Sequence, residues 1–145
     1  MEIHTTDIDG ALIIEPRVFG DQRGFFMETY HQPRYAEGGI PDTFVQDNLS
    51  RSTRGTLRGL HFQIKHPQAK LVQVYEGEVF DVAVDLRAGS PSFGRWTGVR
   101  LSGDNHRQFY VPAGFAHGFA VLSDTALFAY KCSDLYHPED EGGLL

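Results

Sequence analysis

Hydrophobic and polar residues alternate over short stretches of this chain, and glycines separate many of the stretches. The clearest stretch covers residues 79–86. One of its faces holds Phe80, Val82, Val84 and Leu86, and the other holds Val79, Asp81, Ala83 and Asp85. Strict alternation of this kind predicts a β-strand, because successive side chains of a strand point to opposite faces of the sheet.

The same criteria predict strands along most of the chain. They are expected at Ala11–Glu15, Phe25–Tyr30, Thr43–Leu49, Leu57–Gln63, Lys70–Tyr75, Trp96–Leu101, Arg107–Val111, Phe119–Leu122 and Ala126–Cys132. One short helix is expected at residues 32–38, where Pro33 suits a first turn and the following glycines suit a stop. About ten short strands separated by turn residues are typical of a sandwich or barrel. The sequence therefore predicts an all-β fold.

Length and composition narrow the class of protein. A chain of 145 residues is expected to form a single domain, residues 1–145. The formal net charge of −6 argues against nucleic-acid binding, and no apolar run is long enough to cross a bilayer. The N-terminus lacks the basic and apolar regions of a signal peptide, and Cys132 is the single cysteine. We therefore expect a cytoplasmic protein that contacts neither nucleic acid nor membrane.

Four segments carry polar residues that folding alone does not need. They are residues 19–28, residues 44–48, residues 57–63 with Lys70, and residues 112–119 with Tyr130. The last two resemble the pair of motifs in cupin barrels, in which histidines from two strands converge. Pro112, Gly114 and His117 fit the second motif, whereas Gln63 stands where a metal-binding cupin has a second histidine.

A metal site is therefore one reading of the two histidines, although a transition metal needs three or four ligands held together. His61 and His117 do not make that set, and His66 or Glu76 would have to help. The other reading is acid–base chemistry, which suits histidine near neutral pH. His61 as an ordinary half-buried strand residue is the third reading. Several polar residues on neighbouring strands favour a shared cavity: Gln46, Asn48, Arg58, Lys70 and Tyr130.

Taken together, the four segments resemble the dTDP-4-dehydrorhamnose 3,5-epimerase family. The resemblance runs from residues 15–21 to residues 136–141, and the pair LRGLHFQ (57–63) and PAGFAHGF (112–119) is its most specific part. It implies a cupin or jelly-roll barrel that needs no metal or other cofactor. It also implies an isomerase that converts dTDP-4-dehydro-6-deoxy-D-glucose to dTDP-4-dehydro-L-rhamnose, on the way to bacterial surface polysaccharide.

The resemblance also implies residue roles. His61 corresponds to the catalytic base, Tyr130 to the proton donor, and Lys70 to the cation that faces the keto oxygen. Nucleotide- or sugar-contacting positions correspond to Arg23, Glu28, Gln46, Asp47, Asn48, Arg58, His117 and Glu141. Phe19 and Phe26 are candidates for packing against thymine or the sugar, and a place in the core is equally natural for them. Family members are dimers that exchange N-terminal strands (here about residues 1–30), so that Arg23 and Glu28 would complete the partner's site.

Two features of the sequence do not follow this pattern directly. Alternation places Arg58 on the face opposite His61. Either a β-bulge at Gly59 brings both to one side, which we expect, or Arg58 reaches the ligand around an edge of the sheet. The resemblance also implies a C-terminal tail beyond residues 141–145, which supplies an aspartate paired with the catalytic histidine and a lysine near the substrate. Candidate replacements for that aspartate are Asp81, Asp85 and Asp134, although the sequence places none of them beside His61.

Other functions stay open on the sequence alone. The chain could bind a sugar nucleotide with little or no turnover, could epimerise a single carbon, or could be a 3,4-ketoisomerase acting on a related dTDP-sugar. A metal-dependent cupin is a further alternative. Proton exchange with solvent, the identity of the product and metal content would separate these possibilities.

Overall fold

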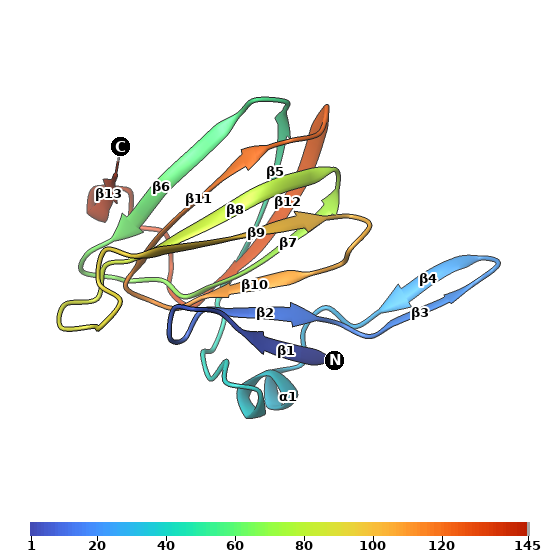
Figure 1. Ribbon diagram of the computed structural model, residues 1–145, viewed down its shortest axis with the longest axis horizontal. Coiled ribbons are helices and arrows are strands. Elements are labelled where there is room, and N and C mark those ends of the chain that lie inside the picture. The colour runs from blue at the N-terminus through green and yellow to red at the C-terminus, as the bar shows by residue number, and fades with distance from the viewer. Residues whose placement is uncertain (145) are drawn as a thin grey trace.

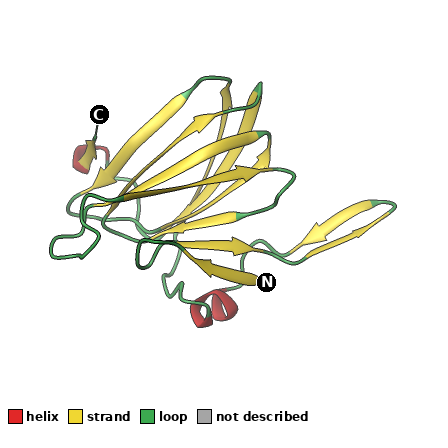
Figure 2. Cartoon of the chain, viewed as in Figure 1, coloured by secondary structure: helices red, strands yellow, loops and turns green. Residues whose placement is uncertain are grey.

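The computed structural model describes residues 1–144 and shows two antiparallel sheets facing each other (Figures 1 and 2). The six-stranded sheet has the spatial order β1-β2-β10-β7-β12-β5. Its strands are β1 (Glu2–Thr5), β2 (Leu12–Glu15), β5 (Gln46–Thr53), β7 (Lys70–Glu76), β10 (Gln108–Val111) and β12 (Thr125–Cys132). The five-stranded sheet has the order β13-β6-β11-β8-β9. Its strands are β6 (Leu57–Gln63), β8 (Glu78–Asp85), β9 (Trp96–Ser102), β11 (Phe115–Val121) and β13 (Glu141–Gly143). The predicted all-β fold is confirmed.

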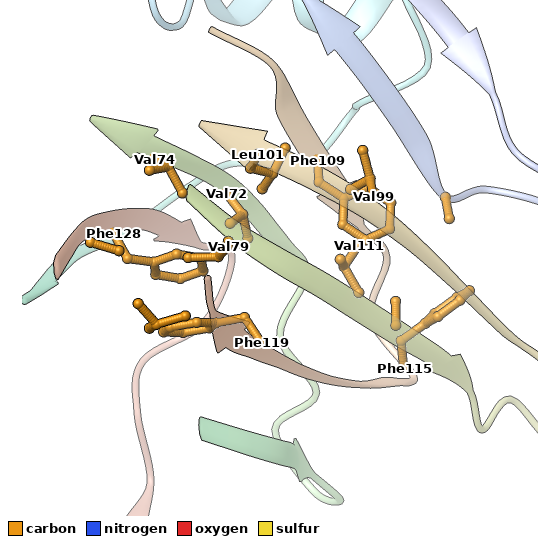
Figure 3. Close-up of a cluster of buried hydrophobic side chains, with 14 of the residues drawn as sticks. Val72, Val74, Val79, Val99, Leu101, Phe109, Val111, Phe115, Phe119 and Phe128 are labelled. Carbon is orange, nitrogen blue, oxygen red and sulfur yellow. The ribbon is translucent and has the colours of Figure 1, made fainter. Parts of the chain in front are cut away.

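The main core lies between the inner faces of the two sheets (Figure 3). Val72 and Val74 of β7 and Phe128 of β12 contribute from one sheet, and Val79 of β8 and Phe119 of β11 contribute from the other. The rings of Phe119 and Phe128 stack with centroids 3.9 Å apart. Burial of such apolar side chains is the main force that holds the layers together.

A second buried cluster covers the outer face of the six-stranded sheet. Leu12, Leu71 and Tyr110 point outward from this sheet and pack with Tyr35 and Ile40. Tyr35 belongs to the one α-helix among the described residues, α1 (Gln32–Glu37), and His31 caps that helix by accepting a hydrogen bond from the backbone N–H of Arg34. The helix predicted around Pro33 is therefore confirmed. Because strands such as β7 are covered on both faces, they lack a polar face along much of their length.

Strand β8 matches the stretch with the clearest alternation, and the structure identifies its inward face. Val79, Asp81, Ala83 and Asp85 are the buried residues of this strand. The face therefore carries two acidic residues into the sandwich. Asp85 accepts hydrogen bonds from Arg87, Ser90 and Ser92, which satisfy its carboxylate. The environment of Asp81 is described with the site below.

A two-stranded hairpin projects from the sandwich (Figure 1). It consists of β3 (Val18–Asp21) and β4 (Gly24–Met27). The side chains of Phe19, Phe25 and Phe26 are 51%, 61% and 71% exposed, respectively. Three exposed aromatic residues on one thin hairpin are unusual, because large apolar side chains in water commonly mark a surface that another molecule covers.

The strand predictions fail mainly at short or fully buried elements. β1, β3 and β13 were not expected, and β4 ends at Met27 rather than at Tyr30. β5 begins at Gln46 rather than at Thr43, and β11 begins at Phe115 rather than at Phe119. The start of β11 is buried at every position, so it has no alternation to reveal it. No helix within residues 1–144 is long and apolar enough to span a membrane.

Candidate active site

A cavity of about 580 Å³ is lined by strands of both sheets. It brings together eight of the residues singled out in the sequence: Gln46, Asn48, Arg58, His61, Lys70, His117, Tyr130 and Glu141. They come from β5, β6 and β7 in the middle of the chain and from β11, β12 and β13 near its C-terminal end. Such a gathering of ionisable groups in one concave site is typical of catalytic centres.

Arg58 and His61 both line this cavity because β6 is irregular between them. His61 pairs with His117 of β11 and Arg58 pairs with Phe119, so three steps along β6 face two steps along β11. Gly59 lies in the irregular stretch with φ at 100°, a conformation that favours glycine. The β-bulge predicted at Gly59 is therefore confirmed, and it explains how alternation fails here.

Replacing Gly59 with alanine is expected to lower both stability and activity. A Cβ there would lie 2.5 Å from the His117 carbonyl oxygen and 2.7 Å from Gly118 Cα, so the β6–β11 pairing must shift. Backbone strain alone costs about 1–3 kcal/mol in the free energy of unfolding. Gly55→Ala is the matched control, because Gly55 has φ at 81° but an added Cβ would meet nothing within 4 Å beyond its chain neighbours. Urea denaturation of both variants checks this, and equal losses would contradict a special role for the close approach at Gly59.

His61 is half-exposed in the cavity and lies beside a carboxylate. Its Nδ1 atom is 3.5 Å from Oε1 of Glu141, and the hydroxyl of Tyr136 donates a hydrogen bond of 2.7 Å to Oε2 of the same glutamate. The negative charge next to Nδ1 favours a proton on that nitrogen and leaves Nε2 as the basic atom. Glu141 reaches this position because β13 pairs with β6, with Gly143 opposite His61.

The aspartates considered as partners of His61 lie elsewhere. Asp81 contacts His117, and Asp85 accepts hydrogen bonds from Arg87 and two serines. Asp134 accepts a hydrogen bond from the backbone N–H of Leu135. The sequence could not identify the nearby carboxylate as Glu141, because β13 is only three residues long and has no pattern of its own.

His117 is buried and forms a close pair with Asp81. Its Nε2 atom lies 2.8 and 2.9 Å from the two carboxylate oxygens of Asp81. The strands explain the contact, since β8 and β11 are neighbours and Asp81 pairs with Phe119, two residues from His117. Burial raises the pKa of Asp81, and the neighbouring His117 acts in the opposite direction.

Lys70 and Tyr130 form the wall opposite the two histidines. They lie on the neighbouring strands β7 and β12, and the Lys70 ammonium is 5.6 Å from the centre of the Tyr130 ring. Burial raises the pKa of Tyr130, so its hydroxyl keeps its proton at neutral pH. Burial lowers the pKa of Lys70, while Cys132, Asp81 and Glu141 oppose that change.

The remaining polar lining consists of hydrogen-bonding groups. The amide of Gln46 donates to Oδ1 of Asn48 at 3.0 Å, and its own oxygen accepts from the backbone N–H of Tyr136. Arg58 donates from Nε to the hydroxyl of Ser52 at 2.9 Å. These contacts fix the orientation of two amides and one guanidinium, which are groups suited to binding a base edge and phosphate oxygens.

Five of the expected site residues do not reach this cavity within the chain. Asp47 alternates with Gln46 and Asn48 on β5, so its side chain lies on the other face of the sheet, where it pairs with Lys131 at 3.0 Å. The other four lie on the projecting hairpin or directly after it: Phe19, Arg23, Phe26 and Glu28. Arg23 pairs with Asp21, and Glu28 pairs with Arg34.

Sequence reasoning missed several residues of the site. Tyr136, Gln63 and Gln68 line the cavity, as do the apolar residues Phe119 and Phe128. Tyr136 lies in the irregular segment between β12 and the short helix η1 (Pro138–Asp140), where no periodicity could indicate its direction. Gln63 was noted only as a replacement for a metal ligand. It instead donates to the carbonyl oxygen of His66 and accepts from the N–H of His137, which joins the loop after β6 to the segment bearing Tyr136.

The two residues named as additional metal ligands do not join the histidines. His66 stacks on His137 with ring centroids 3.8 Å apart, and neither His66 nor Glu76 belongs to the described lining of the cavity. Within residues 1–144, the side chains that could hold a metal together are Glu2, His4 and Glu15, on the edge strand β1 and its neighbour β2.

Comparison with known proteins places this geometry in a family. The family model described as dTDP-4-dehydrorhamnose 3,5-epimerase matches residues 5–145. The dTDP-4-dehydrorhamnose 3,5-epimerase of Pseudomonas aeruginosa is 61% identical over 135 residues, which cover 92% of this chain and 75% of that protein. The enzyme of the same name from Methanothermobacter thermautotrophicus is 58% identical over 139 residues, which cover 96% and 75%.

A solved structure agrees with the sequence relatives. The crystal structure of dTDP-6-deoxy-D-glucose-3,5-epimerase from Legionella pneumophila in complex with dTDP-4-keto-L-rhamnose matches with a TM-score of 0.96 at 61% identity, covering 99% of this chain and 77% of that one. The matched residues include the bulged strand β6, the Asp81–His117 pair and the facing Lys70 and Tyr130. This chain therefore belongs to the dTDP-4-dehydrorhamnose 3,5-epimerase family.

Proposed function

We infer that the chain converts dTDP-4-dehydro-6-deoxy-D-glucose to dTDP-4-dehydro-L-rhamnose by inverting C3 and C5. The observation that carries this is the placement of a base and an acid on facing walls of one cavity. His61 lies on the five-stranded sheet, and Tyr130 lies on the six-stranded sheet with Lys70 beside it. Inversion of a carbon requires a proton to leave one face and a proton to arrive at the other, which this arrangement allows.

The mechanism uses proton transfers alone. The ketone at C4 acidifies the hydrogens at both C3 and C5. His61 removes one of these protons, and the electron pair of the broken C–H bond moves into an enolate whose oxygen faces the Lys70 ammonium. Tyr130 then gives its phenolic proton to the opposite face of the carbon, and solvent restores the protonation states of both residues. The electrons balance without an oxidant, a reductant or a metal.

The polar lining offers groups for the nucleotide. Arg58 provides a charged guanidinium for a diphosphate oxygen, and Gln46 and Asn48 provide amides for a base or sugar. Glu141 has two roles in this proposal, because it lines the cavity and also orients His61. These assignments follow from the types of the residues and from their common location.

We further propose that the hairpin β3–β4 completes the site of a second copy of the chain. Phe19, Phe26 and Arg23 are exposed on a projecting hairpin and have no role in their own cavity (Figure 1). In a two-fold dimer each hairpin would cross to the partner, which would bury its aromatic residues and bring Arg23 and Glu28 to the partner's ligand. In this dimer each copy of the chain forms a single catalytic domain.

Mixing two inactive variants tests this exchange. Arg23→Ala damages the site of the partner, whereas His61→Ala damages the chain's own site. After subunits are mixed at equal amounts and allowed to re-associate, half of the dimers pair the two variants and one site in each is intact, so about one quarter of normal activity should return. Re-association of each variant with itself is the control. Activity no higher than in the separate variants would contradict hairpin exchange.

Analysis of the product by NMR tests the proposed reaction. The proposal predicts that the carbonyl stays at C4 and that the configurations at C3 and C5 invert. A ketone that has moved to C3 would identify a 3,4-ketoisomerase, and inversion at one carbon would identify a single-carbon epimerase. Binding without any product would identify a sugar-nucleotide-binding protein.

We also propose a cytoplasmic location, where the buried free thiol of Cys132 persists in reduced form.

A further inference from the structure

An acidic residue, Asp81, lies beneath the cavity, and the proposed mechanism does not use it. Asp81 is fully buried on the inward face of β8, between the valine and alanine side chains of the core. A carboxylate in such a place is costly unless its charge is balanced and its oxygens are hydrogen-bonded. Its neighbours therefore indicate what the charge does.

The first neighbour is His117, whose Nε2 atom contacts both carboxylate oxygens at 2.8 and 2.9 Å. An ionised carboxylate can only accept hydrogen bonds, so this contact requires a proton on Nε2. The other ring nitrogen, Nδ1, is then the one left for the cavity that His117 lines. His117 also pairs in register with His61, so the buried pair lies directly beside the proposed base.

The second neighbour is Lys70, which reaches the same region from the other sheet. Burial disfavours its charged form, and the groups that oppose this effect are Cys132 of its neighbouring strand, Asp81 beneath the cavity and Glu141 at the rim. The Tyr130 ring lies over it, and His117 and His61 face it from the other wall. Among these groups Asp81 is the buried carboxylate, and solvent screens its charge least.

We propose that Asp81 is a positioning residue of the epimerase site, which fixes the ring orientation and tautomer of His117 and places a negative charge on the side of the sandwich that faces Lys70. One buried carboxylate thereby leaves Nδ1 of His117 as an acceptor in the cavity, and it opposes the loss of charge at Lys70, the donor for the oxygen that becomes the enolate. This inference rests on the proposed function, because it assigns Lys70 to that oxygen. It adds a residue that acts through others and does not touch the substrate.

The same strand offers a matched control. Asp85 is as deeply buried as Asp81 and lies four residues further along β8, on the same face. It is held by Arg87, Ser90 and Ser92 and is not part of the cavity lining. Asp81→Asn and Asp85→Asn therefore remove the same charge from equally buried positions, and only the first lies under the site. Thermal unfolding of both variants establishes that they are folded.

The first readout is the tautomer of His117, which needs no substrate. Nitrogen-15 NMR of histidine-labelled protein should show a proton on Nε2 of His117 in the unchanged chain, with the resonance assigned by its loss in His117→Gln. Asparagine can either donate to or accept from Nε2, so Asp81→Asn should give a mixture of tautomers. Asp85→Asn should leave the signal unchanged. An unaltered His117 signal in Asp81→Asn would overturn the tautomer assignment.

The second readout is the rate and its pH dependence. Asp81→Asn should lower kcat at least roughly tenfold while KM stays within about threefold, because the substrate contacts are kept. Asp81 opposes the effect of burial on Lys70, so its loss lowers the pKa of Lys70 further. The alkaline limb of the rate profile should therefore move to lower pH. Asp85→Asn should keep kcat and the profile within about twofold of the unchanged chain.

The outcomes separate this inference from the proposed function. An unchanged chain that catalyses exchange through His61, together with a fully active Asp81→Asn variant, would overturn the role of Asp81 alone. Equal loss of kcat in Asp81→Asn and Asp85→Asn would show a general effect on folding and would also overturn it. An unchanged chain that gives no exchange would contradict the proposed function itself, and the NMR readout would still report on the Asp81–His117 contact.

Discussion

Replacing His61 with alanine is expected to lower the rate of deuterium incorporation from solvent at C3 and C5 by about 10²- to 10⁴-fold. The substitution removes the group that takes the proton and leaves the opposite wall of the cavity, with Lys70 and Tyr130, in place. Because His61 is half-exposed at the rim and Glu141 is its one ion-pair partner among the described residues, the fold should tolerate the change. Mass spectrometry of the recovered sugar nucleotide in D₂O measures the effect.

A surface histidine provides the control for this loss. His4 lies on the edge strand β1 beside Glu2 and Glu15, outside the cavity. His4→Ala should exchange at the rate of the unchanged chain. If His61→Ala kept its rate within about threefold, another group would have to be the base, and His117 would be the first candidate because it lies in register with His61.

Replacing Tyr130 with phenylalanine is expected to separate proton removal from inversion. His61 can still take the proton and return one to the same face, so deuterium should enter substrate that keeps its original configuration. Formation of the epimerised product should fall by about 10²- to 10⁴-fold, because the opposite face has lost its donor. The two quantities are measured on one sample, exchange by mass spectrometry and configuration by NMR coupling constants.

The pKa of Tyr130 supports this division of labour. Burial raises the pKa, so the hydroxyl is protonated throughout the neutral range and is ready to donate. The Phe variant keeps the ring that packs near Phe128 and the Lys70 ammonium. Equal formation of the epimer by Tyr130→Phe and by the unchanged chain would show that a water molecule or another side chain delivers the proton.

Regular alternation is what made most of the fold predictable. β8 and β12 were anticipated to within one residue at each end, because buried residues alternate along much of each strand. β6 was anticipated at the residues where it occurs, although its alternation is interrupted at Gly59. β11 was only half recognised, since it is buried from its first residue. The short strands β1, β3 and β13 carry too few residues for any period, and β3 is exposed along its whole length. These segments form strands because they pair with neighbouring strands, and their own sequences do not indicate it.

The site was predictable where it depends on strand faces and on the resemblance of the two histidine motifs. The bulge at Gly59 followed from the conflict between Arg58 and His61, and the register of β6 and β11 resolves it as expected. The pairing of Asp81 with His117 was not foreseen, because alternation showed that Asp81 shares a face with Ala83 but not which neighbouring strand that face meets. Glu141 as the carboxylate next to His61 depends on β13 returning to β6, which no local pattern encodes.

The most direct test of the proposed epimerisation follows the reaction of this chain with dTDP-4-keto-6-deoxyglucose in D₂O. We expect that deuterium enters at both C3 and C5, that both centres invert, and that His61→Ala abolishes the incorporation. A folded chain that binds the sugar nucleotide at this cavity but leaves C3 and C5 free of deuterium would contradict the proposal.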